Sequence, residues 1–285
     1  MNKPLLKWAG NKYRVLPFLI PHIGYPKRYC EPFGGSLAVA LNTPAEQYIL
    51  NDVNKDLVAI YQNLVNPNDD NFIKYCQELF TSENNTREAY IDLVKHFNQA
   101  TDSVERARLF IYLNRHCFNG LSRYNKKGDF NVPYGREFKD KKTGEKYIQS
   151  AYFPEEEMMN FRMYFLTKQL VRFTSLSFED PSLYEDLEAG DVVYFDPPYV
   201  PASDTANFTS YATDGFTHDQ QVQLANLAES LAAKGIKVIV SNHNTPVTQE
   251  LYKNATIYPI QVTRTIAANG GSRKKAEELI AVYSC

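Results

Sequence analysis

A motif with the residue types for group transfer lies at Asp196-Pro197-Pro198-Tyr199, directly after the apolar run 192–195. Ligands of open α/β sheets bind at the carboxyl ends of strands, so an acid in this position faces a binding site. The Asp196 carboxylate and the Pro197 carbonyl are two fixed acceptors, since proline removes a donor and restricts φ. Together they would take both hydrogens of an exocyclic amine and turn its lone pair towards an electrophile, while Tyr199 offers a face for stacking a base. The alternative is a simple strand end, because prolines cannot continue a ladder.

A glycine turn and an acid indicate a second ligand contact. Glu31-Pro32-Phe33-Gly34-Gly35-Ser36 follows a short apolar run, and Asp52 ends the next one, 17 residues after Gly35. Glycines let the backbone approach a ligand closely, although a Gly-Gly pair is equally a plain turn. An acid at the end of the second strand suits hydrogen bonds to ribose hydroxyls. Its alternative is a helix N-cap, supplied by Asp52 or Asn54.

Two residues near the amino terminus also have two interpretations. Lys12 lies close to Gly10 and suits a substrate carboxylate, although an isolated lysine is usually solvated surface. Trp8, the single tryptophan, packs either in the core or on a cofactor.

Basic residues gather between Glu105 and Lys146, where eleven Lys or Arg accompany five acids, although the whole chain has a net charge of −2. A solvated charged face is the usual meaning of such a run. A nucleic-acid surface is the sharper interpretation, because counterion release rewards local charge. The twenty Tyr and seventeen Phe suit a core and also suit base stacking.

Composition excludes several classes of protein. The 285 residues allow one large domain or two modest ones, and 44% hydrophobic residues exclude a disordered chain. The sequence contains no run of eighteen apolar residues, so it predicts no membrane-spanning helix. No secretory signal is visible at the amino terminus. The four cysteines are far apart and the histidines lack ligand spacing. We therefore expect a cytoplasmic globular protein without a metal.

Hydrophobic patterns predict the elements that hold these motifs. Residues 28–33, 47–51, 191–195 and 236–240 predict buried strands, with a helix at 37–41 after the glycine turn. Between about residues 57 and 121 the three- and four-residue spacing predicts helices, and residues 139–150 predict a surface loop. Residues 256–263 and 279–283 predict a terminal antiparallel pair. The pattern predicts a doubly wound α/β domain with an inserted helical domain.

The motifs, taken together, resemble those of the Dam-type DNA adenine-N6 methyltransferase family. Asp196-Pro197-Pro198-Tyr199 is similar to the catalytic motif of amino-methyltransferases that use S-adenosylmethionine. The other matching segments occur in the order of the family: Leu6 to Lys12, Glu31 to Ser36, Asn51 to Asn54, residues 113–125, 130–136 and 205–209, Ser241-Asn242-His243, and residues 269–275. The resemblance covers nearly the whole chain. Asn11 and Leu37 depart from it, since each stands where a glycine is common.

The resemblance implies a fold and an activity. The fold would be a Rossmann-like methyltransferase core with a mixed seven-stranded sheet, formed by residues 1–55 and 160–285, and a helical DNA-recognition domain at residues 56–159. The enzyme would bind S-adenosylmethionine, release S-adenosylhomocysteine, need no metal, and methylate N6 of an adenine flipped out of double-stranded DNA. The implied target is GATC. The sequence indicates no membrane contact and no obligate protein partner.

The resemblance also assigns site residues. The catalytic motif is Asp196, Pro197, Pro198 and Tyr199. The residues assigned to the cofactor are Trp8, Lys12, Phe33, Gly35, Asp52, Phe178 and Asp196. Phe178 resembles the adenine-stacking aromatic of the family, although an isolated phenylalanine is typical of a core. The residues assigned to DNA are Lys7, Phe118, Asn119, Leu121, Arg123, Asn125, Pro133 and Arg136. Arg123 and Lys7 would read guanines, and Leu121 and Pro133 would touch a thymine methyl group. Phe118 with Asn119 would enter the base stack or meet the orphan base.

Alternatives remain at this point. A methyltransferase of the same fold acting on RNA, on a protein amide or on another DNA sequence is one. RNA and amide enzymes typically carry Asn at position 196 and lack the region around Arg123. A silent DNA-binding module is the second, against which Asp196 and Asp52 count. A nicotinamide enzyme is the third, although the glycine pattern is incomplete.

Overall fold

The computed structural model describes residues 1–200, 216–263 and 275–284, so residues 205–209 and 269–274 of the resemblance lie outside the described part. The chain forms two compact units, which we call the helical unit and the sheet unit. The helical unit contains Met1–Asn11, Gly35–Leu41 and Asn54–Lys168, and the sheet unit contains Lys12–Gly34, Asn42–Val53 and Gln169–Cys285. Residues 1–11 and 35–41, expected in the core from sequence, thus cluster with the helices. That the helical unit recognises DNA stays a prediction.

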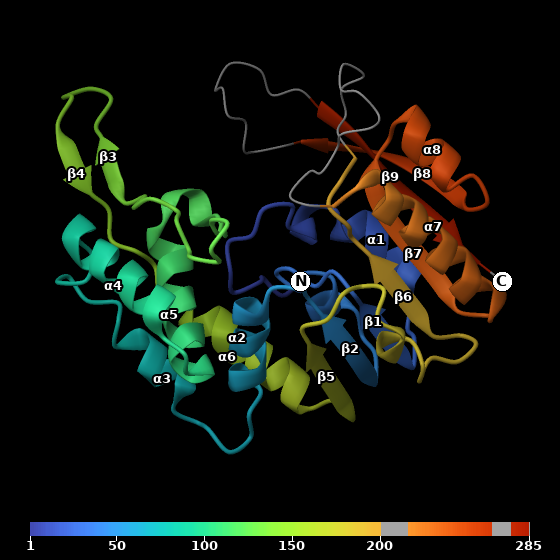
Figure 1. Ribbon diagram of the computed structural model, residues 1–285, viewed down its shortest axis with the longest axis horizontal. Coiled ribbons are helices and arrows are strands. Elements are labelled where there is room, and N and C mark those ends of the chain that lie inside the picture. Colours follow the sequence, from blue (N-terminus) through green and yellow to red (C-terminus); the bar gives the residue numbers. More distant parts are fainter. Residues whose placement is uncertain (201–215, 264–274, 285) are drawn as a thin grey trace. The chain divides into compact units, whose positions relative to one another are not determined.

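The sheet unit contains a mixed seven-stranded sheet in the order β5-β2-β1-β6-β7-β9-β8 (Figure 1). Its strands are β1 (Arg28–Glu31), β2 (Gln47–Asn51), β5 (Leu170–Thr174), β6 (Val192–Phe195), β7 (Lys237–His243), β8 (Thr256–Thr263) and β9 (Lys275–Tyr283). Strands β5, β2, β1, β6 and β7 are parallel, and β9 is antiparallel to both β7 and β8. This architecture confirms the predicted α/β class and the terminal antiparallel pair.

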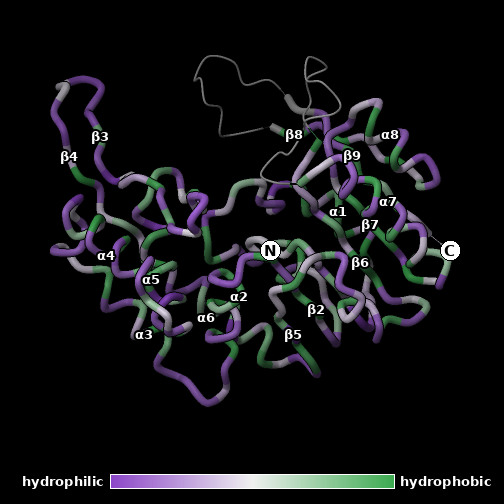
Figure 2. The backbone as a smooth tube through the Cα atoms, viewed as in Figure 1, coloured by the Kyte–Doolittle hydropathy of each residue, from purple (hydrophilic) through white to green (hydrophobic). Residues whose placement is uncertain are grey.

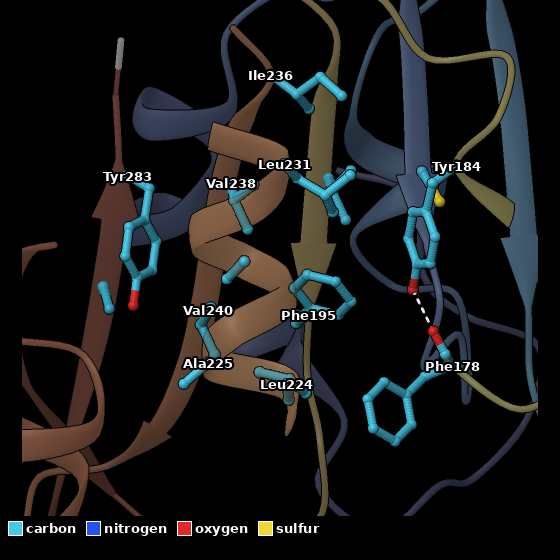
Figure 3. Packing of buried hydrophobic residues seen from close by; sticks show 14 of the residues in the cluster. Phe178, Tyr184, Phe195, Leu224, Ala225, Leu231, Ile236, Val238, Val240 and Tyr283 are labelled. Carbon is cyan, nitrogen blue, oxygen red and sulfur yellow. Dashed lines mark hydrogen bonds between the residues drawn. The ribbon is translucent and has the colours of Figure 1, made fainter. Parts of the chain in front are cut away.

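Buried apolar residues fix the middle of this sheet. The helical segments of the sheet unit are η1 (Lys12–Arg14), α1 (Leu16–Ile23), η4 (Pro181–Leu183), α7 (His218–Ala233) and α8 (Pro246–Leu251). Helix α7 starts at a capping box formed by Thr217 and Gln220. Its Leu224 and Leu231 share a buried cluster with Phe195 of β6 (Figure 3). Shortening one of these leucines to alanine would cost about 2–5 kcal/mol. This packing fixes the last residue of β6, which directly precedes Asp196.

The helical unit is organised around one buried helix. Its elements are α2 (Lys55–Leu64), α3 (Phe72–Gln77), α4 (Arg87–Gln99), α5 (Ser103–His116), η3 (Phe118–Gly120), β3 (Glu137–Lys139), β4 (Lys146–Ile148) and α6 (Glu155–Leu166). Asp102 caps α5 by accepting a hydrogen bond from the backbone N–H of Glu105. Every residue of α5 from Leu109 onward is buried. In Figure 2 the tip of the β3–β4 hairpin is hydrophilic, whereas β6 and β7 carry hydrophobic stretches.

Three local predictions differ from the structure. Residues 37–41 do not form an α-helix, because Leu37 has a φ of 54° and only the short 3-10 turn η2 (Ala40–Asn42) follows. The predicted loop at 139–150 contains β4, which pairs with β3, so most of it is an exposed hairpin. Strand β5 was not predicted, since it is a partly exposed edge strand without clear alternation. No helix in residues 1–200, 216–263 or 275–284 has the length and hydropathy to span a membrane.

Candidate active site

Asp196 follows β6, which lies between β1 and β7 in the parallel part of the sheet. Parallel strands end on the same edge, so the residues after β1, β2 and β6 gather there. Asp196 Oδ1 is shielded from solvent and lies 2.8 Å from the ammonium of Lys12. The side chain of Lys12 is 9% exposed and that of Asp196 is 18% exposed. Lys12 is therefore not a solvated surface lysine, which was the alternative interpretation of its sequence position.

The charge of Asp196 depends on its neighbours. Burial raises the pKa of Asp196 above its usual value, because the carboxylate loses hydration. The Lys12 ammonium opposes this rise, and the negative charge of Glu278 adds to it. Lys12 therefore helps to keep Asp196 an ionised acceptor at neutral pH.

Tyr199 is held on several sides. Its hydroxyl donates a hydrogen bond to Glu278 Oε2 at 3.2 Å. The Lys12 ammonium lies 4.6 Å from the centre of the ring, and the His243 ring meets it edge-on at 4.9 Å between centroids. Burial, followed by the charges of Asp196 and Glu278, raises the pKa of Tyr199 well above its usual value. The phenol is therefore a protonated donor with a fixed orientation.

Side chains from α7 and β7 fix the backbone of the motif. Gln221 donates to the Pro198 carbonyl at 2.7 Å, and the backbone N–H of Val200 donates to Asn242 Oδ1 at 3.0 Å. Asn242 also donates to Gln221 Oε1 at 3.3 Å. These bonds turn a strand end into a rigid loop. The plain strand-stop interpretation leaves them unexplained.

Two aromatic side chains and an acid follow strands of the parallel part of the sheet: Phe33 follows β1, Phe178 follows β5 and Asp52 follows β2. Phe33 is half-buried and stacks on Phe178 with 5.3 Å between ring centroids. Phe178 is only 5% exposed, and its carbonyl accepts a hydrogen bond from the Tyr184 hydroxyl (Figure 3). Asp52 is half-buried at the end of β2. The cap of α2 is Asn54, whose side chain accepts from Asp56 and Leu57, so the N-cap interpretation belongs to Asn54.

Trp8 and Gly35 touch each other within the helical unit. Gly35 has a φ of 47°, and a Cβ on it would lie 2.8 Å from Trp8 Nε1. The Tyr61 hydroxyl donates to the Gly35 carbonyl at 2.6 Å. Glycine is thus required here by close packing against the indole as well as by the turn.

Lys7 is fixed by α5. Its backbone N–H donates to Asn114 Oδ1 at 3.0 Å, and Asn114 Nδ2 donates to the Lys7 carbonyl at 2.7 Å. Asn114 also donates to the carbonyl of Gly120, where a Cβ would lie only 2.4 Å from Lys7 Cβ. Partial burial and the charges of Arg115 and Arg136 lower the pKa of Lys7. A cluster of cations such as Lys7, Arg115 and Arg136 favours an anionic or electron-rich partner.

The segment after α5 presents several of the predicted DNA residues. Phe118 is 51% exposed, Asn119 is exposed with a φ of 56°, and Pro133 is exposed. Leu121 is half-buried, and Asn125 uses its side chain within its own turn, accepting from the backbone of Lys127 and Asp129. The exposed part of this segment is therefore aromatic and polar.

Two arginines of this segment have defined partners. Arg123 donates from Nε to Asn131 Oδ1 at 2.8 Å and from Nη2 to the Asn131 carbonyl at 2.9 Å, while the residue stays exposed. Arg136 is 8% exposed and donates to the carbonyls of Gln149 and Ser150. Arg123 is thus oriented at the surface, whereas Arg136 holds the base of the hairpin.

Known proteins match the chain over almost its full length. The family model described as D12 class N6 adenine-specific DNA methyltransferase matches residues 8–266. The DNA adenine methylase of Escherichia coli is 43% identical over 284 residues, which cover 99% of this chain and 95% of the relative. That of Vibrio cholerae is 41% identical over 284 residues, covering 99% and 96%. The chain belongs to this family of adenine-specific DNA methyltransferases.

The methyltransferase also aligns with a solved precorrin 8w decarboxylase of Methanobacterium thermoautotrophicum, at 10% identity and a TM-score of 0.36, over 100% of this chain and 96% of that one. At that score the alignment carries no argument. Within the described residues of the methyltransferase, no cluster of three His, Cys, Asp or Glu is arranged to hold a metal ion.

Several residues around the motif of the methyltransferase were not singled out from sequence. Gln221 and Glu278 carry no local signal, since each lies on an element far along the chain from Asp196. Asn242 was part of a matching segment, but its role as an acceptor for the motif was not predicted. Asn114 and Asn131 also lay in matching segments. Their partners became visible only when the fold brought Lys7 and Arg123 to them.

Proposed function

We propose that the methyltransferase transfers a methyl group from S-adenosylmethionine to N6 of an adenine flipped out of double-stranded DNA, within GATC. The ion pair between Lys12 and Asp196 at the end of β6 carries this proposal. It keeps an ionised acceptor in a poorly solvated place, as the orientation of an amine requires. Family membership favours this function over the RNA, amide and nicotinamide alternatives.

The residues after β1, β2 and β5 fit the proposed cofactor. Asp52 would accept hydrogen bonds from ribose hydroxyls, and the Phe33 and Phe178 rings would pack against the adenine. Trp8, Gly35 and Lys12 remain sequence-based assignments to the cofactor. When bound, S-adenosylmethionine supplies an electrophilic methyl group on a positively charged sulfur.

The motif residues would act as fixed acceptors. Asp196 and the Pro197 carbonyl would take the two hydrogens of the adenine amine, so that the nitrogen lone pair points towards the methyl group. Pro198 is held by Gln221, which stops the loop from rotating away. Because these groups are in place before the substrate arrives, little reorganisation is needed during reaction. The Tyr199 ring would stack on the flipped base.

The helical unit would read and hold DNA. Asn131 accepts from Nε and from one Nη2 hydrogen of Arg123, so a guanine would be read through Nη1 and the second Nη2 hydrogen. Lys7 would read a second guanine, while Leu121 and Pro133 would contact a thymine methyl group. Phe118 and Asn119 would fill the gap left by the flipped base. Arg136, whose Nε and one Nη2 hydrogen are engaged, would reach a phosphate through Nη1 or the second Nη2 hydrogen.

One experiment tests the proposed function directly. The purified protein is incubated with S-adenosylmethionine and unmethylated genomic-length DNA, and every N6-methyladenine is located by sequencing. We expect methylation at the adenine of GATC. Methylation at another sequence would refute the target while leaving the chemistry, and no N6-methyladenine under any condition would refute both.

A further inference from the structure

Glu278 is a buried carboxylate beside the Asp196–Tyr199 motif, and it belongs to none of the motifs found in the sequence. It lies on β9, opposite His243 of β7 and Ile260 of β8, and is 8% exposed. Its Oε2 accepts the hydrogen bond from the Tyr199 hydroxyl at 3.2 Å. Strand β9 is thus connected directly to the loop after β6, although the two are distant in sequence.

The charges around Glu278 are not balanced in pairs. Asp196 and Glu278 are two carboxylates, and Lys12 is the ammonium that contacts Asp196 at 2.8 Å and lies 4.6 Å from the Tyr199 ring centre. Among the described residues, the other titratable groups near them include the Tyr194 phenol of β6, which is hydrogen-bonded to Ser241, and the His243 ring of β7. Burial raises the pKa of Tyr194, and the buried Glu31 carboxylate at the end of β1 adds to this rise. In the part of the chain that the structure describes, the cluster therefore contains more carboxylates than ammonium groups.

We propose that Glu278 is a positioning residue for methyl transfer, which fixes the Tyr199 ring through its hydroxyl and places a second negative charge beside Asp196. This inference rests on the proposed roles of Asp196 and Tyr199. A phenol bound to a carboxylate is held more strongly than one bound to a neutral acceptor, so the ring keeps one orientation for the base. The added charge makes Asp196 a stronger base, which strengthens its grip on the amine as positive charge develops there.

A purely structural role of Glu278 would lead to a different experimental result. If Glu278 merely satisfied a buried hydroxyl, its removal would lower stability and leave the chemistry of the folded enzyme unchanged. Glu278→Gln separates the two roles, because it keeps an acceptor for Tyr199 and removes the charge. Tyr199→Phe is the complementary variant, because it keeps the ring and removes the donor.

The test compares wild type, Glu278→Gln, Glu278→Ala, Tyr199→Phe and the Glu278→Ala/Tyr199→Phe double variant on an unmethylated duplex with S-adenosylmethionine. In Glu278→Gln we expect the acid limb of kcat/KM to move to lower pH by on the order of one unit, since a charge that raises the pKa of Asp196 is gone. In Glu278→Ala we expect kcat to fall about 10- to 100-fold with little change in KM for DNA. The double variant should be no slower than the slower single variant.

Each outcome decides the inference. An acid limb that stays in place in Glu278→Gln, or additive losses in the double variant, would overturn it. If Glu278→Ala does not fold, as judged by thermal unfolding, the pH profile of Glu278→Gln still decides. An Asp196→Ala enzyme with full activity would refute the proposed function itself, which separates that failure from a failure of Glu278 alone.

Discussion

Lys12 Nζ and Asp196 Oδ1 lie 2.8 Å apart within the sheet unit, joining the turn before α1 to the acid after the central strand β6. Burial raises the pKa of Asp196 and so disfavours the carboxylate, whereas the Lys12 ammonium lowers this pKa and favours the carboxylate. We therefore propose that the activity of the motif depends on Lys12, which in the sequence has the pattern of an ordinary solvated lysine.

Lys12→Gln should shift the pH dependence of methylation. The pKa of Asp196 is already raised by burial, and loss of the ammonium raises it further. Activity needs the carboxylate and is lost as pH falls through that pKa, so the acid limb of kcat/KM should move to higher pH. Lys3→Gln, at an exposed position in the same amino-terminal segment, serves as control. An unchanged limb in Lys12→Gln would show that another group sets the ionisation of Asp196.

Asp52→Ala should reduce the affinity for S-adenosylmethionine more than it reduces kcat. Loss of hydrogen bonds to a charged acceptor corresponds to about 1.5–3 kcal/mol, or roughly 10- to 100-fold in affinity. We expect this loss in the Kd for S-adenosylmethionine, measured by calorimetric titration, with a smaller change in kcat. Asp219→Ala, at an exposed acid in the first turn of α7, is the matched control. Equal affinity in Asp52→Ala and wild type would remove Asp52 from the cofactor site.

Arg123→Ala should relax discrimination at one guanine by about 1–3 kcal/mol, because O6 and N7 mark guanine alone in the major groove. Asn131→Ala should have a smaller effect of the same kind, since Asn131 orients the Arg123 guanidinium. The measurement is kcat/KM on duplexes with each base replaced in turn. Lys126→Ala, at an exposed lysine of the same turn, is the control. A uniform loss on all duplexes in Arg123→Ala would make Arg123 a backbone contact.

His116 should make the folded state sensitive to acid. It is 1% exposed and stacks on Tyr112 with 3.8 Å between centroids, and burial lowers the pKa of His116 to about 4. The unfolded residue binds a proton near pH 6.5, so stability present above that pH should be lost as pH falls towards 4. The loss from this group is on the order of 3 kcal/mol at most. Urea unfolding between pH 7 and 4 should show it, and His116→Gln should flatten that dependence.

Sequence reasoning reached the fold and part of the site for identifiable reasons. Buried strands such as β6 and β7 are predicted from their apolar runs, and Asp196 directly follows β6. Strand β5 does not, because an edge strand half open to solvent needs no such run. The pairing of Lys12 with Asp196, and the contact of Tyr199 with Glu278, could not be read from spacing. They arise from strand order, which places β9 beside β7 and brings distant residues together.

We propose that Asp196 orients the adenine amine. The single-turnover rate of Asp196→Ala on an unmethylated GATC duplex at saturating S-adenosylmethionine tests this role. We expect a rate lower by on the order of 10²–10³, by analogy with the loss of one preorganised catalytic hydrogen bond. Thermal unfolding and DNA affinity should show that the variant is folded and binds its substrate. A folded Asp196→Ala enzyme that methylates adenine at the wild-type rate would contradict the account.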